Sequence, residues 1–154
     1  KDVWGYMDSQ ETSGLSPEMF RDLVFPAYKK IMAEMGRVSY GCCEAVDPIW
    51  DSCLSHVPNL GKVSISPWCN EEFMGEQLAG REITYLRKPT PNLIGITKVL
   101  DENAVRKHFA RTVKAAKGCW LEIVQRDVYK IYDTPDKVRR YVSLIRSECD
   151  KHQK

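Results

Sequence analysis

Short apolar runs alternate along the chain with longer segments whose apolar residues recur every three or four positions. The short runs predict strands at 3–7, 37–41, 60–66, 82–86 and 121–125, with 93–96 as a short extension of the fourth strand. The longer segments predict helices at 16–35, 47–56, 70–79, 101–117 and from Thr134 onward. Five strand–helix units in a row predict an α/β fold with parallel strands.

The ends of the predicted helices carry the expected capping residues. Helix starts are marked by Ser16 (followed by Pro17), Asn70 and Asp101. Glycines follow the last apolar positions of three helices, at Gly36, Gly80 and Gly118. We therefore expect these glycines to end their helices.

The chain holds five units, whereas a (β/α)₈ barrel has eight units in about 250 residues. Residues 1–154 are expected to form one domain, because no linker or low-complexity tract divides them. The domain is either a small open sheet or the second part of a barrel. The first residue is Lys1 rather than Met, so we expect a processed product or a fragment.

Composition excludes several classes of protein. The net charge of +2 gives no basic footprint for nucleic acid. No apolar run approaches the length of about 20 residues that spans a bilayer, and no signal peptide is visible. The six cysteines form no CxxC pair, which indicates free thiols and a cytoplasmic location.

In α/β folds of this kind, functional sites lie beyond the carboxyl ends of the strands. Residues that follow the predicted strands are polar and rich in sulfur. The carboxylates that we single out for acid–base catalysis are Glu11, Glu44 and Asp127. The candidates for substrate binding are Asp8, Trp68, Lys88, Asn92, Gln125 and Arg126. Each of these residues is also compatible with a solvated loop, a cap or simple packing.

Adjacent cysteines follow the second strand. Cys42 and Cys43 are candidate zinc ligands, with Glu44 or Cys69 as a further ligand. Zinc would hold a thiol substrate as its thiolate and make it a nucleophile. The alternatives are that both cysteines are small, inert residues, or that they provide a reactive or substrate-contacting thiol. His56, His108 and His152 fall inside or at the ends of predicted helices, and we expect them to be surface or capping residues.

Five segments, in this order along the chain, resemble the uroporphyrinogen decarboxylase superfamily. They are 16–20 (SPEMF), 25–29 (FPAYK), 38–44 (VSYGCCE), 58–64 (PNLGKVS) and 133–138 (DTPDKV). The resemblance is greatest to the C-terminal part of uncharacterised and corrinoid-associated methyltransferase members. It implies a (β/α)₈ barrel with its site at the carboxyl-end mouth.

The resemblance also implies two activities. The decarboxylase branch removes carboxyl groups from a tetrapyrrole, with key residues in an N-terminal part that this chain does not contain. The methyltransferase branch moves a methyl group between a substrate or thiol and a corrinoid protein, using zinc. In that branch Cys42 stands at the first cysteine ligand, Tyr40 replaces the histidine, and Gln125, Arg126 and Asp127 stand where a later cysteine would be.

We therefore expect a corrinoid-associated methyltransferase that is inactive or incomplete as this fragment. Its partners would be a small-molecule substrate, a corrinoid protein, and either the missing N-terminal half of the barrel or a second copy. The alternative is a degenerate barrel that binds a small ligand or a corrinoid protein without catalysis.

Overall fold

In the computed structural model, which describes residues 2–132 and 134–152, five parallel strands form one sheet. The strands are β1 (Trp4–Met7), β2 (Arg37–Tyr40), β3 (Leu60–Ile65), β4 (Thr84–Arg87) and β5 (Trp120–Ile123). They lie side by side in the order in which they occur along the chain. The predicted alternation of parallel strands and helices is confirmed. Asp133, the first residue of the last segment with family resemblance, lies outside the described residues.

Helices connect the strands. The α-helices are α1 (Pro17–Met19), α2 (Phe25–Met32), α3 (Glu71–Leu78), α4 (Asn92–Gly95), α5 (Glu102–Ala115) and α6 (Pro135–His152). The π-helical turn η2 (Phe20–Val24) joins α1 to α2, and short 3₁₀ turns form η1 (Gln10–Thr12), η3 (Asp47–Ile49) and η4 (Leu54–His56). Ser16, Asn70 and Asp101 each accept a backbone N–H at a helix start, as predicted.

The first predicted helix differs from the structure at two places. Its π-helical turn ends at Val24, two residues before Pro26, which has no N–H to donate to the preceding turn. The helix ends at Met32 rather than beside Gly36, because the Gly36 N–H donates to the Val3 carbonyl (3.0 Å). By contrast, Gly80 and Gly118 have φ of +72° and +80°, as expected of glycines that end helices.

Two other predicted elements are wrong. The predicted helix at 47–56 is two separate 3₁₀ turns, because Cys53 has non-helical angles (φ −135°, ψ −71°). The predicted strand extension at 93–96 is helix α4. Pro91 has helical angles, and its carbonyl accepts the Gly95 N–H at 2.8 Å, which starts a helical turn instead of a strand.

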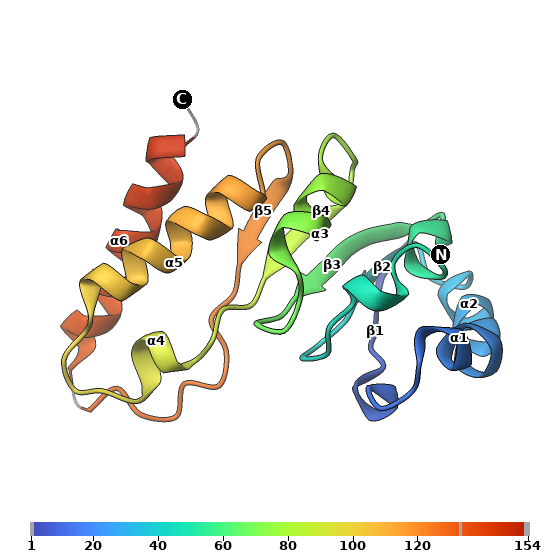
Figure 1. Ribbon diagram of the computed structural model, residues 1–154, viewed down its shortest axis with the longest axis horizontal. Coiled ribbons are helices and arrows are strands. Elements are labelled where there is room, and N and C mark those ends of the chain that lie inside the picture. The colour runs from blue at the N-terminus through green and yellow to red at the C-terminus, as the bar shows by residue number, and fades with distance from the viewer. Residues whose placement is uncertain (1, 133, 153–154) are drawn as a thin grey trace.

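Helices cover one face of the sheet (Figure 1). Val38, Val63 and Tyr85 point to that face and are fully buried. Parallel strands in sequential order with right-handed crossovers place every connecting helix on the same side. The ends of the sheet carry α1 and α2 beside β1, and α5 and α6 beside β5.

The opposite face of the sheet has no layer over it in the part of the chain described. Trp4, Tyr6 and Trp120 point to this face and are 56%, 54% and 58% exposed. Lys62 pairs with Glu122 across the same face and also lies 5.8 Å above the Trp4 ring. We call this surface the free face of the sheet.

No helix in the described residues combines the length and the apolar character needed to cross a membrane.

Candidate functional site

The carboxyl ends of β1, β2, β4 and β5 meet around the loop 41–44. Gly41 begins this loop with φ of +94°, a conformation that favours glycine, and its N–H donates to the Met7 carbonyl at 2.8 Å. The next residues, Cys42 and Cys43, are half-buried. The loop therefore presents two neighbouring thiols at the edge of the sheet where sites are expected.

The buried Glu44 holds this loop in place. Its two carboxylate oxygens accept backbone N–H groups, from Ser9 at 3.1 Å and from Cys42 at 2.9 Å. Tyr40 supports Ser9 with a hydrogen bond from its hydroxyl (2.7 Å). The Glu44 carboxylate, which was predicted to serve catalysis or metal binding, therefore holds the loops after β1 and β2 together.

Two cations lie against the loop 41–44. Lys88 Nζ is 3.3 Å from the Cys42 carbonyl oxygen, and Arg126 Nη1 is 3.4 Å from the same oxygen. Arg126 Nη1 is also 3.9 Å from Cys42 Sγ. The structure brings together the predicted residues Cys42, Cys43, Lys88 and Arg126 from three different strand ends.

Burial and hydrogen bonding compete at this cluster. Burial raises the pKa of the Cys43 thiol, and a hydrogen bond from Arg126 opposes that rise. Burial acts to lower the pKa of Arg126, but hydrogen bonds to Cys43 and Asp127 outweigh it and the pKa is raised. The pKa of Tyr6 is raised by partial burial and by hydrogen bonds with Cys42 and Asp8. Arg126 is therefore a permanent cation beside the thiols.

A cavity of about 500 Å³ opens next to Cys43. Its lining includes the predicted residues Trp68, Arg126 and Asp127. Trp68 is 77% exposed and offers a flat apolar surface, while Asp127 pairs with Arg126. A small molecule bound here would lie between an aromatic ring, a guanidinium and a thiol.

The inner wall of the cavity is a buried charged network that the sequence did not reveal. Arg87 and Glu71 pair at 2.9 Å with only 2% and 4% of their surfaces exposed. Glu71 also accepts the Thr112 hydroxyl (2.7 Å), and His108 Nε2 is 3.4 Å from Arg87. The network fixes α3 and α5 to β4.

His108 corrects the prediction that the histidines are surface residues. It is half-buried, and its pKa is lowered by burial first and by the charge of Arg87 second. The signal was present in the sequence, because His108 is three residues from Val105 and four from Thr112, both buried on α5. His56 is exposed, as expected, and the side chain of His152 lies outside the described residues.

Four predicted residues lie outside the thiol cluster. Glu11 and Asn92 are exposed. Gln125 accepts a hydrogen bond from Tyr141 of α6 at 2.5 Å, on the helix-covered side. Asp8 is half-buried and interacts with Tyr6.

The residues do not fit the zinc site that the resemblance implies. No group of three ligand side chains suited to a metal ion occurs in residues 2–132 and 134–152. Glu44 is engaged with backbone N–H groups, Asp127 with Arg126, and Tyr40, at the position of the histidine ligand, is fully buried. Two thiols alone do not complete the tetrahedral donor set that zinc requires.

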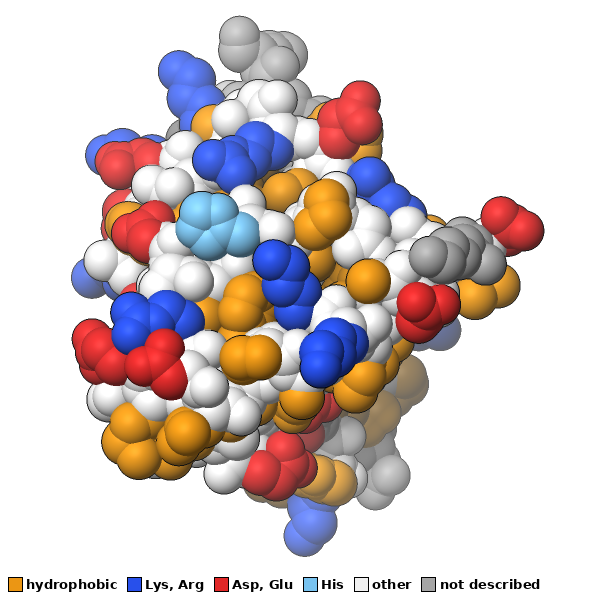
Figure 2. Space-filling view, turned by 90° about the vertical axis from the view of Figure 1, so that its right-hand side faces the viewer, with side chains coloured by type: hydrophobic (Ala, Val, Ile, Leu, Met, Phe, Trp, Pro, Cys, Tyr) orange, Lys and Arg blue, Asp and Glu red, His pale blue; other side chains and the backbone are white. Residues whose placement is uncertain are grey.

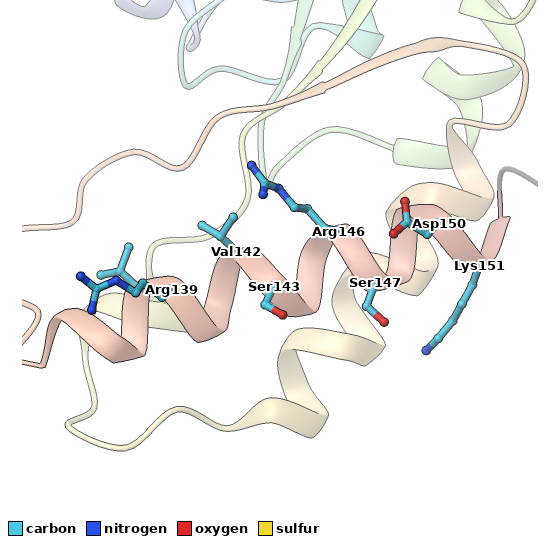
Figure 3. Close-up of a pocket in the computed structure, with 8 residues that line it drawn as sticks. Arg139, Val142, Ser143, Arg146, Ser147, Asp150 and Lys151 are labelled. Atoms are coloured by element: carbon cyan, nitrogen blue, oxygen red, sulfur yellow. The ribbon is translucent and has the colours of Figure 1, made fainter.

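A larger hollow lies elsewhere on the surface, along α6 (Figure 3). It has a volume of about 1000 Å³ and is lined by residues of this one helix, among them Val142, Arg146 and Asp150. A neighbouring apolar groove of about 580 Å³ joins α6 to Ile123 of β5. Neither contains the strand-end thiols, so we assign the candidate site to the cluster around Cys42.

Comparisons with protein families, with curated proteins and with solved structures give no match for this chain.

Proposed function

We propose that the chain is part of a (β/α)₈ barrel of the uroporphyrinogen decarboxylase superfamily and serves methyl transfer of the corrinoid-associated kind. The observation that carries this proposal is the meeting of Cys42, Lys88 and Arg126 at the carboxyl edge of a sequentially ordered parallel sheet. Barrels of this type hold their sites at that edge.

The two flanks of the sheet support a barrel that further strand–helix units would close. In the described residues β1 pairs with β2 alone and β5 with β4 alone. Figure 2 shows the β1 end of the molecule, where hydrophobic side chains lie exposed between charged ones; Met19, Leu23 and Ile31 of the first helices are among the exposed residues. At the other end, the grooves along α6 leave Val142 exposed beside β5.

Unpaired strands and exposed apolar residues favour association with another segment. The free face would become the barrel interior once that segment is in place. The proposed occupant is the N-terminal half of the barrel, and a second copy of the chain is the alternative.

The chain's own residues would bind and orient the reacting thiol compound. Lys88 and Arg126 place positive charge at the loop that holds Cys42, and this charge would attract an anionic thiolate of the substrate. The Trp68 ring offers a surface on which a planar macrocycle can stack. A methylated corrinoid, carried by a partner protein, would supply the methyl group. We assign no step to zinc, because its donor set is incomplete.

A second candidate is a binding module without catalysis. It is favoured by the engagement of Glu44 and Asp127, which leaves neither carboxylate free to move a proton at the thiols. The module would hold a small ligand in the cavity beside Cys43.

Methyl transfer from methylcobalamin to 2-mercaptoethanol, followed by absorbance, tests the proposal. We expect the rate of methyl transfer to exceed the protein-free background. In Cys42→Ser the rate should fall at least about tenfold, which corresponds to the loss of one hydrogen bond from a charged group. Cys149→Ser, on the distant α6, is the matched control.

Alkylation of the thiols by iodoacetamide in the same mixture separates the candidates. Slower alkylation of Cys42 in the presence of methylcobalamin, without methyl transfer, would support the binding module and overturn the first proposal. If the chain shows no methyl transfer and methylcobalamin does not protect Cys42 from alkylation, both candidates are overturned.

A further inference from the structure

Cys42 and Cys43 are adjacent in sequence and close in space. Their sulfur atoms are 3.5 Å apart, and both side chains are half-buried, so they remain open to a ligand. Cys53 and Cys69 are buried, and Cys119 donates to the Gly75 carbonyl of α3. The described residues therefore hold one pair of neighbouring thiols that a ligand can reach.

This pair is poorly suited to a disulfide bond. Adjacent Cα atoms are about 3.8 Å apart across a trans peptide bond, whereas disulfides usually join Cα atoms about 4.4–6.8 Å apart. A bond between neighbours would therefore be strained and easily reduced. An atom that bridges the two sulfurs meets no such constraint, because the sulfurs stay apart.

The pair is equally poorly suited to zinc, because the described part of the chain supplies no third and fourth ligands beside it. A trivalent arsenic centre that already carries one organic group needs only two sulfur ligands. Cys42 and Cys43 supply both without a contribution from Glu44, whose oxygens stay on Ser9 and Cys42 N–H groups.

The cavity provides room for the organic group. Cys43 lines the cavity of about 500 Å³, together with Trp68, Pro89 and Pro91. An aromatic or alkyl substituent on the bridging atom would pack against these apolar side chains while the sulfurs hold the atom itself.

We propose that Cys42 and Cys43 form a two-thiol site that chelates monosubstituted trivalent arsenicals. With phenylarsine oxide, two S–H bonds break, two As–S bonds form, and the oxygen leaves as one water molecule. Arsenic stays trivalent, so no oxidant or reductant takes part. The site goes beyond the proposed methyl transfer and does not depend on it.

Phenylarsine oxide is the probe that tests this site. We expect one equivalent to remove two of the six titratable thiols. The adduct should survive excess 2-mercaptoethanol and be released by 2,3-dimercaptopropanol, because two linked thiols act at high effective concentration. Peptide mapping of the alkylated adduct should show Cys42 and Cys43 as the protected residues.

Single substitutions complete the test. Cys42→Ser or Cys43→Ser should weaken binding about a hundredfold and make the adduct sensitive to 2-mercaptoethanol. Cys119→Ser and Cys149→Ser should leave it unchanged, with circular dichroism confirming the fold of each variant. Protection of other cysteines in the wild-type chain, or resistance to 2-mercaptoethanol in either single variant, would overturn the proposal. Peptide mapping of the wild-type adduct tests whether Cys42 and Cys43 bind the arsenical even where a variant fails to fold.

Discussion

Arg126 and Cys42 lie 84 residues apart and meet at the carboxyl edge of the sheet. Arg126 Nη1 is 3.4 Å from the Cys42 carbonyl oxygen and 3.9 Å from its sulfur. The contact joins the loop after β5 to the loop after β2, across the ends of β3 and β4. It depends on parallel strands, because only these bring their carboxyl ends to one edge.

The buried pair of Arg87 and Glu71 should dominate the stability of the site wall. Arg87→Met would leave the Glu71 carboxylate buried without its partner, and we expect a loss of about 3–5 kcal/mol in the free energy of unfolding. Urea denaturation measures this. Arg111→Met, which removes an exposed pair with Glu72, is the control and should cost less than about 1 kcal/mol. Equal losses of the free energy of unfolding in the two variants would show that the Arg87–Glu71 pair is not desolvated.

His108 should make stability depend on pH. Its pKa is lowered in the folded chain from the ordinary value of 6.5, chiefly by burial and by Arg87. As pH falls below 6.5, the unfolded chain binds the proton first, so the free energy of unfolding decreases. His108→Gln should flatten this decrease, as followed by urea denaturation from pH 7 to lower pH. His56→Gln changes an exposed side chain and should leave the pH dependence of stability unchanged. An unchanged slope of the free energy of unfolding against pH in His108→Gln would contradict the role of His108.

Gly75 sets the approach of α3 to α5. A Cβ atom there would lie 1.8 Å from the Ala115 carbonyl oxygen, which belongs to the backbone and cannot turn away. Gly75→Ala should therefore destabilise the chain by roughly 1–3 kcal/mol, the range for overpacking. Thermal unfolding checks this beside Gly95→Ala, where a Cβ atom meets nothing within 4 Å. A melting temperature equal to that of the control would place the helices further apart than described.

The free face and the two edge strands should drive self-association of the chain. Sedimentation equilibrium of the chain should show a concentration-dependent rise in mass. Trp120→Lys places a charge on the free face of β5, beside Thr84 of β4, and should weaken the association. Tyr129→Lys, at an exposed position in the loop after β5, is the control. A monomer at every concentration would contradict the view that these surfaces need a partner.

Most of the fold could be predicted from the sequence because local signals agreed with tertiary structure. The caps Ser16, Asn70 and Asp101 and the glycines Gly80 and Gly118 are short-range features. The predictions failed where a proline or tertiary contact decided the backbone. Pro91 starts a helical turn just before an apolar run that resembles a strand, and the carbonyl of Val3, the residue before β1, accepts the N–H of Gly36.

The candidate site could be predicted only in part. The rule that sites follow strand ends selected Cys42, Cys43, Lys88 and Arg126, which the structure brings together. The same rule could not show that Glu44 and Asp127 are engaged by neighbouring groups, because those contacts depend on loop geometry. The rule also selects Glu71 and Arg87, but it could not show that these residues, 16 positions apart, form a buried pair.

The proposal of methyl transfer at this edge of the sheet is tested most directly by the rate of methyl transfer from methylcobalamin to 2-mercaptoethanol in the Arg126→Met variant. We expect a loss of about tenfold to a hundredfold, equivalent to one hydrogen bond from a charged group. Arg139→Met, at an exposed position on α6, should retain the wild-type rate. An undiminished rate in Arg126→Met, or a wild-type rate equal to the protein-free background, would contradict the assignment of the reaction to this edge of the sheet.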